Sequence, residues 1–227
     1  MPLELTALLA GRGIGEDEPP RPPRSIPVAV LTMELQRGVM GDLATFPELA
    51  EAANVRGLVP NAARLLRAFR GSGLPVVHCT AEFRADRQGT VPNTPLHTAV
   101  LRRAGHLLTG TPATELVPGL GAQAADLVSS RRHGVAPFTG TDLDEILRGL
   151  GVRVLVVTGV SANVGVLGLC IEAVNLGYQV VVASDAVVGV PLSYGDAVMV
   201  NSVALVASIN TVDEIVGAVT ELTAPST

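Results

Sequence analysis

The chain has 227 residues, which is enough for one sizeable hydrophobic core and few for two ordinary domains. A formal net charge of −5 and an aromatic content of 3% argue against a nucleic-acid partner, which needs basic surface for phosphates and rings for base stacking. All 16 basic residues are arginine, so chemistry that needs a lysine amine is excluded.

The first 25 residues are predicted to form an arm ahead of a single domain over residues 26–227. Leu3–Leu9 favours a short helix, and the Pro-rich, acidic stretch Gly11–Arg24 indicates a surface linker. No apolar run approaches the roughly 20 residues that span a bilayer, and no basic segment precedes an apolar one near the start. We therefore expect a cytoplasmic protein without membrane contact.

Six short apolar runs follow, rich in Val and bounded by turn residues: Val28–Met33, Leu74–Cys79, Asp126–Val128, Arg153–Thr158, Gln179–Ala183 and Ala207–Asn210. Such runs are typical of strands buried on both faces of a parallel sheet. Helical patterns lie between them: Pro60–Ser72, Asp142–Leu150, Val164–Leu176 and Tyr194–Val206. The alternation predicts an α/β fold, a three-layer α-β-α sandwich with a mostly parallel, doubly wound six-stranded sheet of Rossmann-like type. Ligands of such sheets bind at the carboxyl ends of the strands.

Charged residues stand at two of these strand ends. Glu34 directly follows the first run, where partial burial suits a general acid or base; a helix cap or a pair with Arg37 is the alternative. Arg131, Arg132 and His133 follow the run Leu127–Ser130, and one guanidinium could pair with Glu34 or bind a substrate carboxylate. A pair of surface arginines is the alternative there.

Gly165 lies in the first turn of a predicted helix, after the small residues of the strand-to-helix turn that begins at Thr158. Backbone amides at such a turn can bind an anion. Glycine costs roughly 1 kcal/mol against alanine in a helix, so we expect a steric reason for it. Cys170 is predicted to be a buried small side chain, whereas Cys79 at a strand end stays a minor candidate nucleophile.

The segment Phe83–Gly121 is longer than a simple crossover needs. It is interpreted as a lid or substrate loop, and structural filler is the alternative. The four histidines, at positions 78, 97, 106 and 133, lack metal-ligand spacing. No phosphate-binding or dinucleotide-binding glycine motif is present either. We expect neither a metal nor a cofactor.

Three stretches together resemble the isochorismatase-like (cysteine hydrolase) superfamily, over about Pro27–Val216. They are Val-Ala-Val-Leu-Thr-Met-Glu-Leu-Gln-Arg-Gly from residue 28, Arg-His-Gly-Val-Ala-Pro-Phe-Thr-Gly-Thr-Asp-Leu-Asp from residue 132, and Thr-Gly-Val-Ser-Ala-Asn-Val-Gly-Val from residue 158. The resemblance implies a site at the positions of the family's Asp-Lys-Cys triad. Those positions match Glu34, Arg132 and Gly165 here, so each member of the triad is replaced. The family's metal-binding Asp and His residues have no counterpart near Gly38–Asp42.

The resemblance further implies a homo-oligomer, a dimer or tetramer, and a small-molecule substrate. The expected substrate-binding residues are Gln36, His78, Arg84, His133, Phe138, Ser161 and Asn163. Three hypotheses follow. The first is a hydrolase that acts on a small anionic metabolite by general acid–base chemistry, as isochorismatases with glycine at the cysteine position do. The second is an inactive relative that binds a ligand or a protein partner, and the third is a cysteine hydrolase that uses Cys79.

Overall fold

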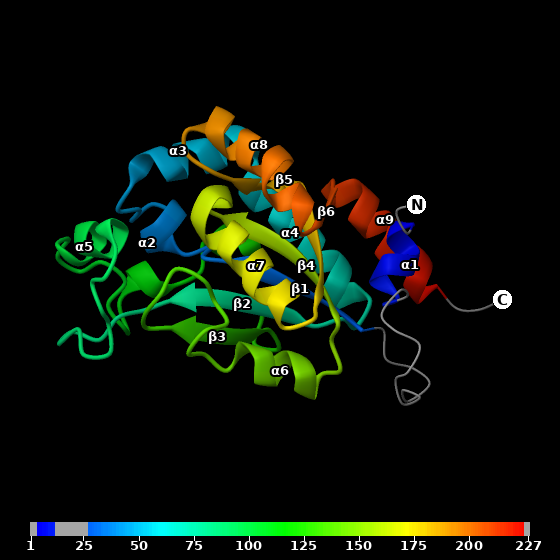
Figure 1. Cartoon of the computed structure of the whole chain (residues 1–227), viewed down its shortest axis with the longest axis horizontal. Helices are drawn as coiled ribbons and strands as arrows, with labels where there is room; N and C mark the ends of the chain where they lie inside the picture. Colours follow the sequence, from blue (N-terminus) through cyan, green and yellow to red (C-terminus); the bar gives the residue numbers. More distant parts are fainter. Residues whose placement is uncertain (1–3, 12–26, 225–227) are drawn as a thin grey trace.

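A six-stranded, wholly parallel sheet forms the centre of the molecule (Figure 1). The structure, a computed structural model, describes residues 4–11 and 27–224. The strands are β1 (Val28–Met33), β2 (Val76–Ala81), β3 (Leu127–Arg131), β4 (Val154–Val160), β5 (Gln179–Val188) and β6 (Ser208–Asn210), in the spatial order β3-β2-β1-β4-β5-β6. The predicted α/β fold with a doubly wound parallel sheet is confirmed.

Helices cover both faces of the sheet, because side chains alternate between the two faces along each strand. One core lies under α1 (Leu5–Leu9), α3 (Pro47–Arg56), α4 (Leu58–Gly71) and α9 (Val212–Thr223), and it takes Val28 and Val30 of β1. The other lies under α6 (Leu143–Gly149), α7 (Leu167–Asn175) and α8 (Leu192–Asn201), and it takes Ala29 and Leu31. The short helices α2 (Arg37–Met40) and α5 (Pro95–Leu101) follow β1 and β2.

Four strands extend further toward their carboxyl ends than their apolar runs predict. β2 ends at Ala81, β4 at Val160 and β5 at Val188, and β3 continues through Ser129 and Ser130 to Arg131. The hydroxyls of this extension find partners, since Ser129 Oγ donates to Asp142 and Ser130 Oγ lies 2.6 Å from Thr80 Oγ1. Satisfied polar side chains can continue a strand that a purely apolar pattern would end.

The helix predicted within Leu3–Leu9 is present as α1, and it packs on the domain. Leu9 is fully buried, and Thr6 Oγ1 donates a 3.0 Å hydrogen bond to Glu221 of α9. The predicted linker lies, apart from Gly11, outside the described residues, and the domain boundary at residue 25 stays a prediction. Within the described ranges, no helix has the length and apolar character needed to cross a membrane.

Candidate active site

Glu34 lies at the carboxyl edge of the sheet, one residue beyond the end of β1. Its backbone N–H donates to the Cys79 carbonyl of β2 at 2.9 Å, and its φ of 52° falls in the left-handed region. This conformation is uncommon for residues other than glycine and clusters at functional sites. β1 lies beside β4 at the point where the strand order reverses, which is where ligands of such sheets bind.

Arg131, the last residue of β3, pairs with Glu34. Its Nη2 donates a hydrogen bond to Glu34 Oε1, and its Nε donates to the Gly134 carbonyl at 2.9 Å. The side chains are 9% and 15% exposed, so the ion pair is shielded from solvent. Arg131 Nη1 is buried and has no hydrogen-bond partner among the described residues. A carboxylate is thereby fixed in place, and one N–H group of the guanidinium is left for another ligand.

Arg132, the residue expected at the cation position, lies elsewhere. It is exposed, and its carbonyl oxygen accepts a hydrogen bond from Thr90 Oγ1 at 2.7 Å. The placement of Arg132 beside Glu34 is therefore corrected to Arg131. The cause is the length of β3: the strand runs to Arg131, so the side chain of that residue faces Glu34 and the next residue turns outward.

A steric clash explains why glycine occupies position 165, as its place in a predicted helix led us to expect. It lies in a π-helical turn (Ala162–Val166) between β4 and α7. A Cβ atom at this position would stand 2.9 Å from the Val160 carbonyl oxygen and 3.0 Å from Met33 Cε. The first of these contacts is shorter than real Cβ atoms show, so the observed backbone requires glycine.

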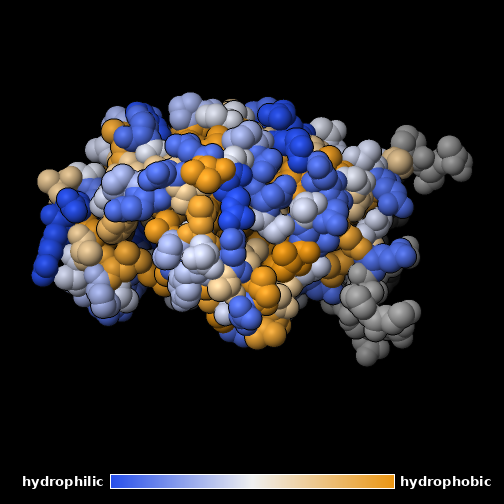
Figure 2. Space-filling model, turned by 90° about the horizontal axis from the view of Figure 1, so that it is seen from above, coloured by the Kyte–Doolittle hydropathy of each residue, from blue (hydrophilic) through white to orange (hydrophobic). Residues whose placement is uncertain are grey.

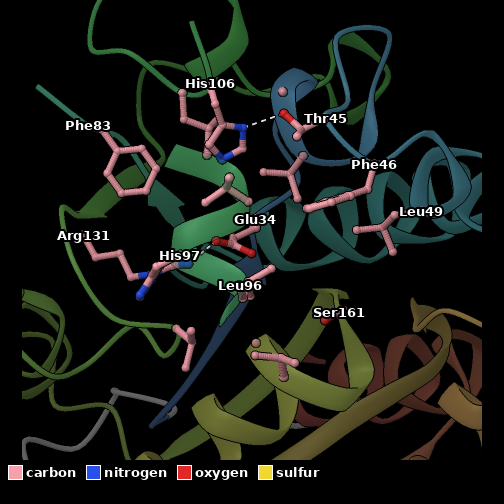
Figure 3. A pocket seen from close by; sticks show the side chains of 17 residues that line it. Glu34, Thr45, Phe46, Leu49, Phe83, Leu96, His97, His106, Arg131 and Ser161 are labelled. Carbon is pink, nitrogen blue, oxygen red and sulfur yellow. Dashed lines mark hydrogen bonds and ion pairs between the residues drawn. The ribbon is translucent and has the colours of Figure 1, made fainter. Parts of the chain in front are cut away.

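A pocket of about 140 Å³ opens over Glu34, Arg131 and Gly165 (Figure 3). Its polar lining residues are Glu34, Thr45, His97, His106, Arg131 and Ser161, and its other lining residues are Gly38, Val39, Phe46, Leu49, Phe83, Leu96, Val100, Leu107, Val135, Val164 and Gly165. Ligand pockets for drug-sized molecules measure roughly 300 Å³ or more, so this one suits a small molecule. Its walls are mainly apolar, and its polar groups converge near the strand ends.

Much of this lining comes from the long segment Phe83–Gly121, as expected if that segment is a substrate loop. His106 Nδ1 lies 2.6 Å from Thr45 Oγ1, and burial lowers the pKa of His106 to about 4. The nearby Arg87 guanidinium makes a smaller contribution to the same lowering. His106 is therefore neutral at neutral pH. His97 is 4% exposed, and its Nε2 lies 3.1 Å from the Gly134 carbonyl oxygen.

Neither cysteine offers a nucleophile. Cys79 is 1% exposed, and burial raises its pKa to about 12. Cys170 is fully buried, and burial raises its pKa to about 12 as well. Both cysteines are free thiols. A thiol attacks as its thiolate, so the hypothesis of a hydrolase that uses Cys79 loses its chemical basis.

Three of the expected substrate-binding residues form contacts within the domain and do not line the pocket. Gln36 is fully buried and exchanges two hydrogen bonds with the Ala81 backbone. His78 is also fully buried, between Thr32 Oγ1 at 2.8 Å and Asp126 Oδ2 at 3.2 Å. Phe138 stacks on Tyr178 with a ring-centroid distance of 5.8 Å.

Of the other four, Ser161 lines the pocket. Arg84 is exposed and pairs with Asp86 at 2.7 Å. His133 lies 5.6 Å from the His97 ring, and Asn163 belongs to the π-helical turn; neither lines the pocket. No group of three or more potential metal ligands occurs within residues 4–11 and 27–224, and a metal-free site stays a prediction.

Comparison with known proteins agrees with the fold. The Isochorismatase domain matches residues 28–214. The chain belongs to the isochorismatase family. An uncharacterized isochorismatase family protein of Bacillus subtilis, YwoC, is 30% identical over 70% of this chain and 76% of its own length.

The chain is also similar to a solved structure of the family and to a relative that is named as probably inactive. The solved structure of an isochorismatase family protein from Burkholderia thailandensis superposes with a TM-score of 0.71 at 27% identity, and the match covers 85% of this chain and 95% of that one. A probable inactive nicotinamidase of Arabidopsis thaliana is 28% identical over 70% of this chain and 79% of its own length.

Proposed function

We propose that this family member is a hydrolase of a small anionic metabolite that works by general acid–base chemistry without a covalent intermediate. The observation that carries the proposal is the buried Glu34–Arg131 ion pair beside Gly165. Glycine offers no nucleophile, and the two cysteines are buried as thiols. Water is then the attacking group.

Glu34 is the residue that moves protons in this scheme. As one half of an ion pair it is a carboxylate, so it can accept a proton from the attacking water and return it to the leaving group. Arg131 is fully protonated at working pH and holds the carboxylate in place without exchanging a proton. Positioned acid–base groups of this kind contribute typically 10²–10⁴-fold to rate.

The anionic character of the substrate rests on Arg87, because Arg131 already shares its charge with Glu34. Arg87 lies against two pocket-lining residues: its guanidinium carbon stands 5.3 Å from the Phe83 ring centroid, and its Nη1 donates to the His106 carbonyl at 3.3 Å. It is half-buried, and no carboxylate pairs with it in the part of the chain that the structure describes. A partly desolvated cation without a counter-charge favours a negatively charged group on the ligand.

The test is turnover by the Glu34→Gln variant on a panel of vinyl ethers, amides and small esters. Gln keeps the size of the side chain and removes its basicity, so we expect turnover to be abolished. Glu51→Gln, on the exposed face of α3, is the matched control and should keep full activity. Unaltered turnover by Glu34→Gln refutes the mechanism.

The second candidate is a catalytically inactive relative that binds a ligand or a protein partner. It is favoured by the replacement of all three triad positions and by the similarity to a probable inactive nicotinamidase. A thermal-shift panel of small metabolites separates the two candidates. Stabilisation by a ligand that is never turned over supports the binding protein, whereas turnover that depends on Glu34 supports the hydrolase.

We also propose that the chain forms a homo-oligomer, a dimer or tetramer, and acts in the cytoplasm. Support for the oligomer comes from Val200 and Leu205, which are 70% and 81% exposed near the end of α8. Figure 2 displays hydrophobic areas between hydrophilic ones on the face seen from above. Burial of such side chains against a second copy would stabilise an assembly. Light scattering of the purified chain tests it.

A further inference from the structure

The chain leaves the sheet after β2 at Phe83 and returns beside the same residue at Leu107. The Phe83 N–H donates to the Leu107 carbonyl at 2.7 Å, and the Thr109 N–H donates to the Phe83 carbonyl at 2.9 Å. Phe83 and Leu107 are both buried. The segment Arg84–Gly105, which contains α5, thus begins and ends at one firmly held point beyond the carboxyl end of β2 (Figure 1).

The body of this segment is only lightly attached to the domain. Its buried residues are His97 and Val100 of α5, both of which line the pocket, and most of its other residues are exposed. Segments with few buried side chains open locally at a small cost in free energy. Opening of Arg84–Gly105 would take part of the pocket wall away with it.

The segment bonds the loop that directly follows Arg131. Each residue of this loop, Arg132–Gly134, faces one hydrogen-bonding group of the segment. The pairs are Thr90 Oγ1 with the Arg132 carbonyl at 2.7 Å, the Val91 N–H with His133 Nδ1 at 3.3 Å, and His97 Nε2 with the Gly134 carbonyl at 3.1 Å. Because the three contacts are consecutive, the loop and the closed segment form one unit.

The Gly134 carbonyl connects this unit to the candidate base. It also accepts from Arg131 Nε at 2.9 Å, and Arg131 Nη2 donates to Glu34 Oε1. A carbonyl oxygen accepts and never donates, so His97 Nε2 carries the proton that faces Gly134. A chain of hydrogen bonds therefore runs from His97 through the Gly134 carbonyl and Arg131 to Glu34, and Figure 3 shows these three side chains next to one another.

The sequence around His97 fixes this residue to its helix. Thr94 is the N-cap of α5, Pro95 is the first helical residue, and the His97 backbone N–H donates to Thr94 Oγ1 at 3.0 Å. An N-cap followed by proline sets the conformation of the first helical turn. The imidazole of His97 therefore follows α5 when the segment moves.

We propose that Arg84–Gly105 is a lid whose closure positions Arg131 against Glu34, with His97 as the positioning residue that joins them. When the loop moves with the lid, the Arg131 Nε–H loses its buried acceptor, and a buried donor without a partner is unfavourable. The guanidinium then turns toward water, and its bond to Glu34 weakens. Closure thus covers the pocket and completes the ion pair in one step, as lids of enzymes do. The inference rests on the proposed function in taking Glu34 as the residue that moves protons.

The test follows the solvent exchange of the Arg131 Nε–H in ¹⁵N NMR spectra of the full chain. A buried N–H exchanges when its hydrogen bond opens, so the rate reports how firmly Arg131 is held. His97→Leu keeps an apolar side chain in the pocket wall and removes the donor, and it should accelerate this exchange at least about fivefold. His97→Gln keeps an N–H donor and should stay within about twofold of the natural chain. Unchanged exchange in His97→Leu overturns the proposal, as does failure of His97→Gln to restore it.

Thr90→Val is the matched control for the lid. It removes the bond to the Arg132 carbonyl without a change of shape and leaves the contact with Gly134 in place. The Arg131 Nε–H exchange should then change by less than about twofold. An acceleration as large as that in His97→Leu would mean that no special role belongs to His97, and it overturns the assignment.

Turnover, where it is found, separates positioning from a contribution to the pocket wall. His97→Leu should lower kcat at least about tenfold, because a displaced ion pair impairs the chemical step. A side chain that only forms the wall would raise KM and leave kcat unchanged, and that result overturns the positioning role.

A measurement on the natural chain covers the case in which His97→Leu does not fold. The His97 Nε2–H and the Arg131 Nε–H should be protected from exchange equally, within about threefold, because one opening exposes both. Protection of the Arg131 proton that is more than about tenfold stronger overturns the lid, as does a His97 ring protonated at Nδ1 instead of Nε2. These readouts need no substrate, whereas the proposed hydrolase fails through turnover that is indifferent to Glu34→Gln.

Discussion

Arg131 reaches across one strand of the sheet to bond Glu34. Arg131 ends β3, Glu34 follows β1, and β2 lies between these strands. The contact joins residues that are 97 positions apart in the chain. Because both side chains are largely buried, each charge depends on the other for compensation. The ion pair is therefore both the centre of the candidate site and a structural tie between strands.

Arg131→Met should destabilise the fold, whereas Arg132→Met should not. Removal of one partner of a buried ion pair typically costs about 3–5 kcal/mol, because the other charge stays buried without compensation. Arg132 is exposed, and substitution of such a residue usually changes stability by less than about 0.5 kcal/mol. Denaturant unfolding of the two variants measures the difference. Equal effects would contradict the assignment of the cation to Arg131.

Gly165→Ala should destabilise the protein, because its Cβ atom would stand 2.9 Å from the Val160 carbonyl oxygen. Overpacking of this kind typically costs 1–3 kcal/mol. Gly217→Ala in α9 is the matched control: a Cβ atom there meets nothing within 4 Å, and alanine is favoured over glycine in a helix by about 1 kcal/mol. Thermal unfolding should thus move in opposite directions for the two variants. Gly165→Cys adds the same Cβ atom and should also be destabilised, so this single substitution should not restore a cysteine hydrolase.

The fold could be predicted from the sequence because parallel strands buried on both faces appear as short Val-rich runs. The ends of the strands were harder to predict from the sequence. The apolar run before Arg131 ends at Val128, because Ser129 and Ser130 are polar. In the structure these two hydroxyls form hydrogen bonds with Asp142, just before α6, and with Thr80 of β2, so the strand continues. Arg132 was expected beside Glu34 because it matches the cation position of the resemblance, and only the end of β3 at Arg131 shows which of the two arginines faces Glu34.

The residues of the site at the strand ends could be predicted from the sequence, whereas the residues that form the walls of the pocket could not. Glu34, Ser161 and Gly165 stand directly where the topology places a ligand. His97 and His106 enter from the long segment after β2, and nothing in their spacing distinguished them from His78, which lies buried under α4. Their roles depend on backbone partners such as the Gly134 carbonyl, which no sequence pattern reveals.

Neither cysteine should react with alkylating reagents in the folded protein at pH 8. The pKa values of Cys79 and Cys170 are raised to about 12 by burial, so almost no thiolate is present, and both sulfur atoms are shielded from reagents. Mass spectrometry after iodoacetamide treatment should find no adduct until denaturant is added, and then two. Rapid modification of Cys79 in the folded state, with loss of a measured activity, would restore the cysteine mechanism.

Stability should fall as the pH is lowered from 6.5 toward 4. Burial lowers the pKa of His106 from 6.5 to about 4, and burial also lowers that of His78, although the Asp126 carboxylate opposes this second shift. Below pH 6.5 the unfolded chain therefore binds protons that the folded chain excludes, which favours unfolding. Each such group contributes at most about 1.4 kcal/mol per pH unit within its window. Urea unfolding at several pH values should show the decline, and His106→Gln should show a shallower one, to which His78 and carboxylates of lowered pKa such as Glu214 still contribute. An identical slope in both proteins would mean that His106 is not held neutral by the pocket.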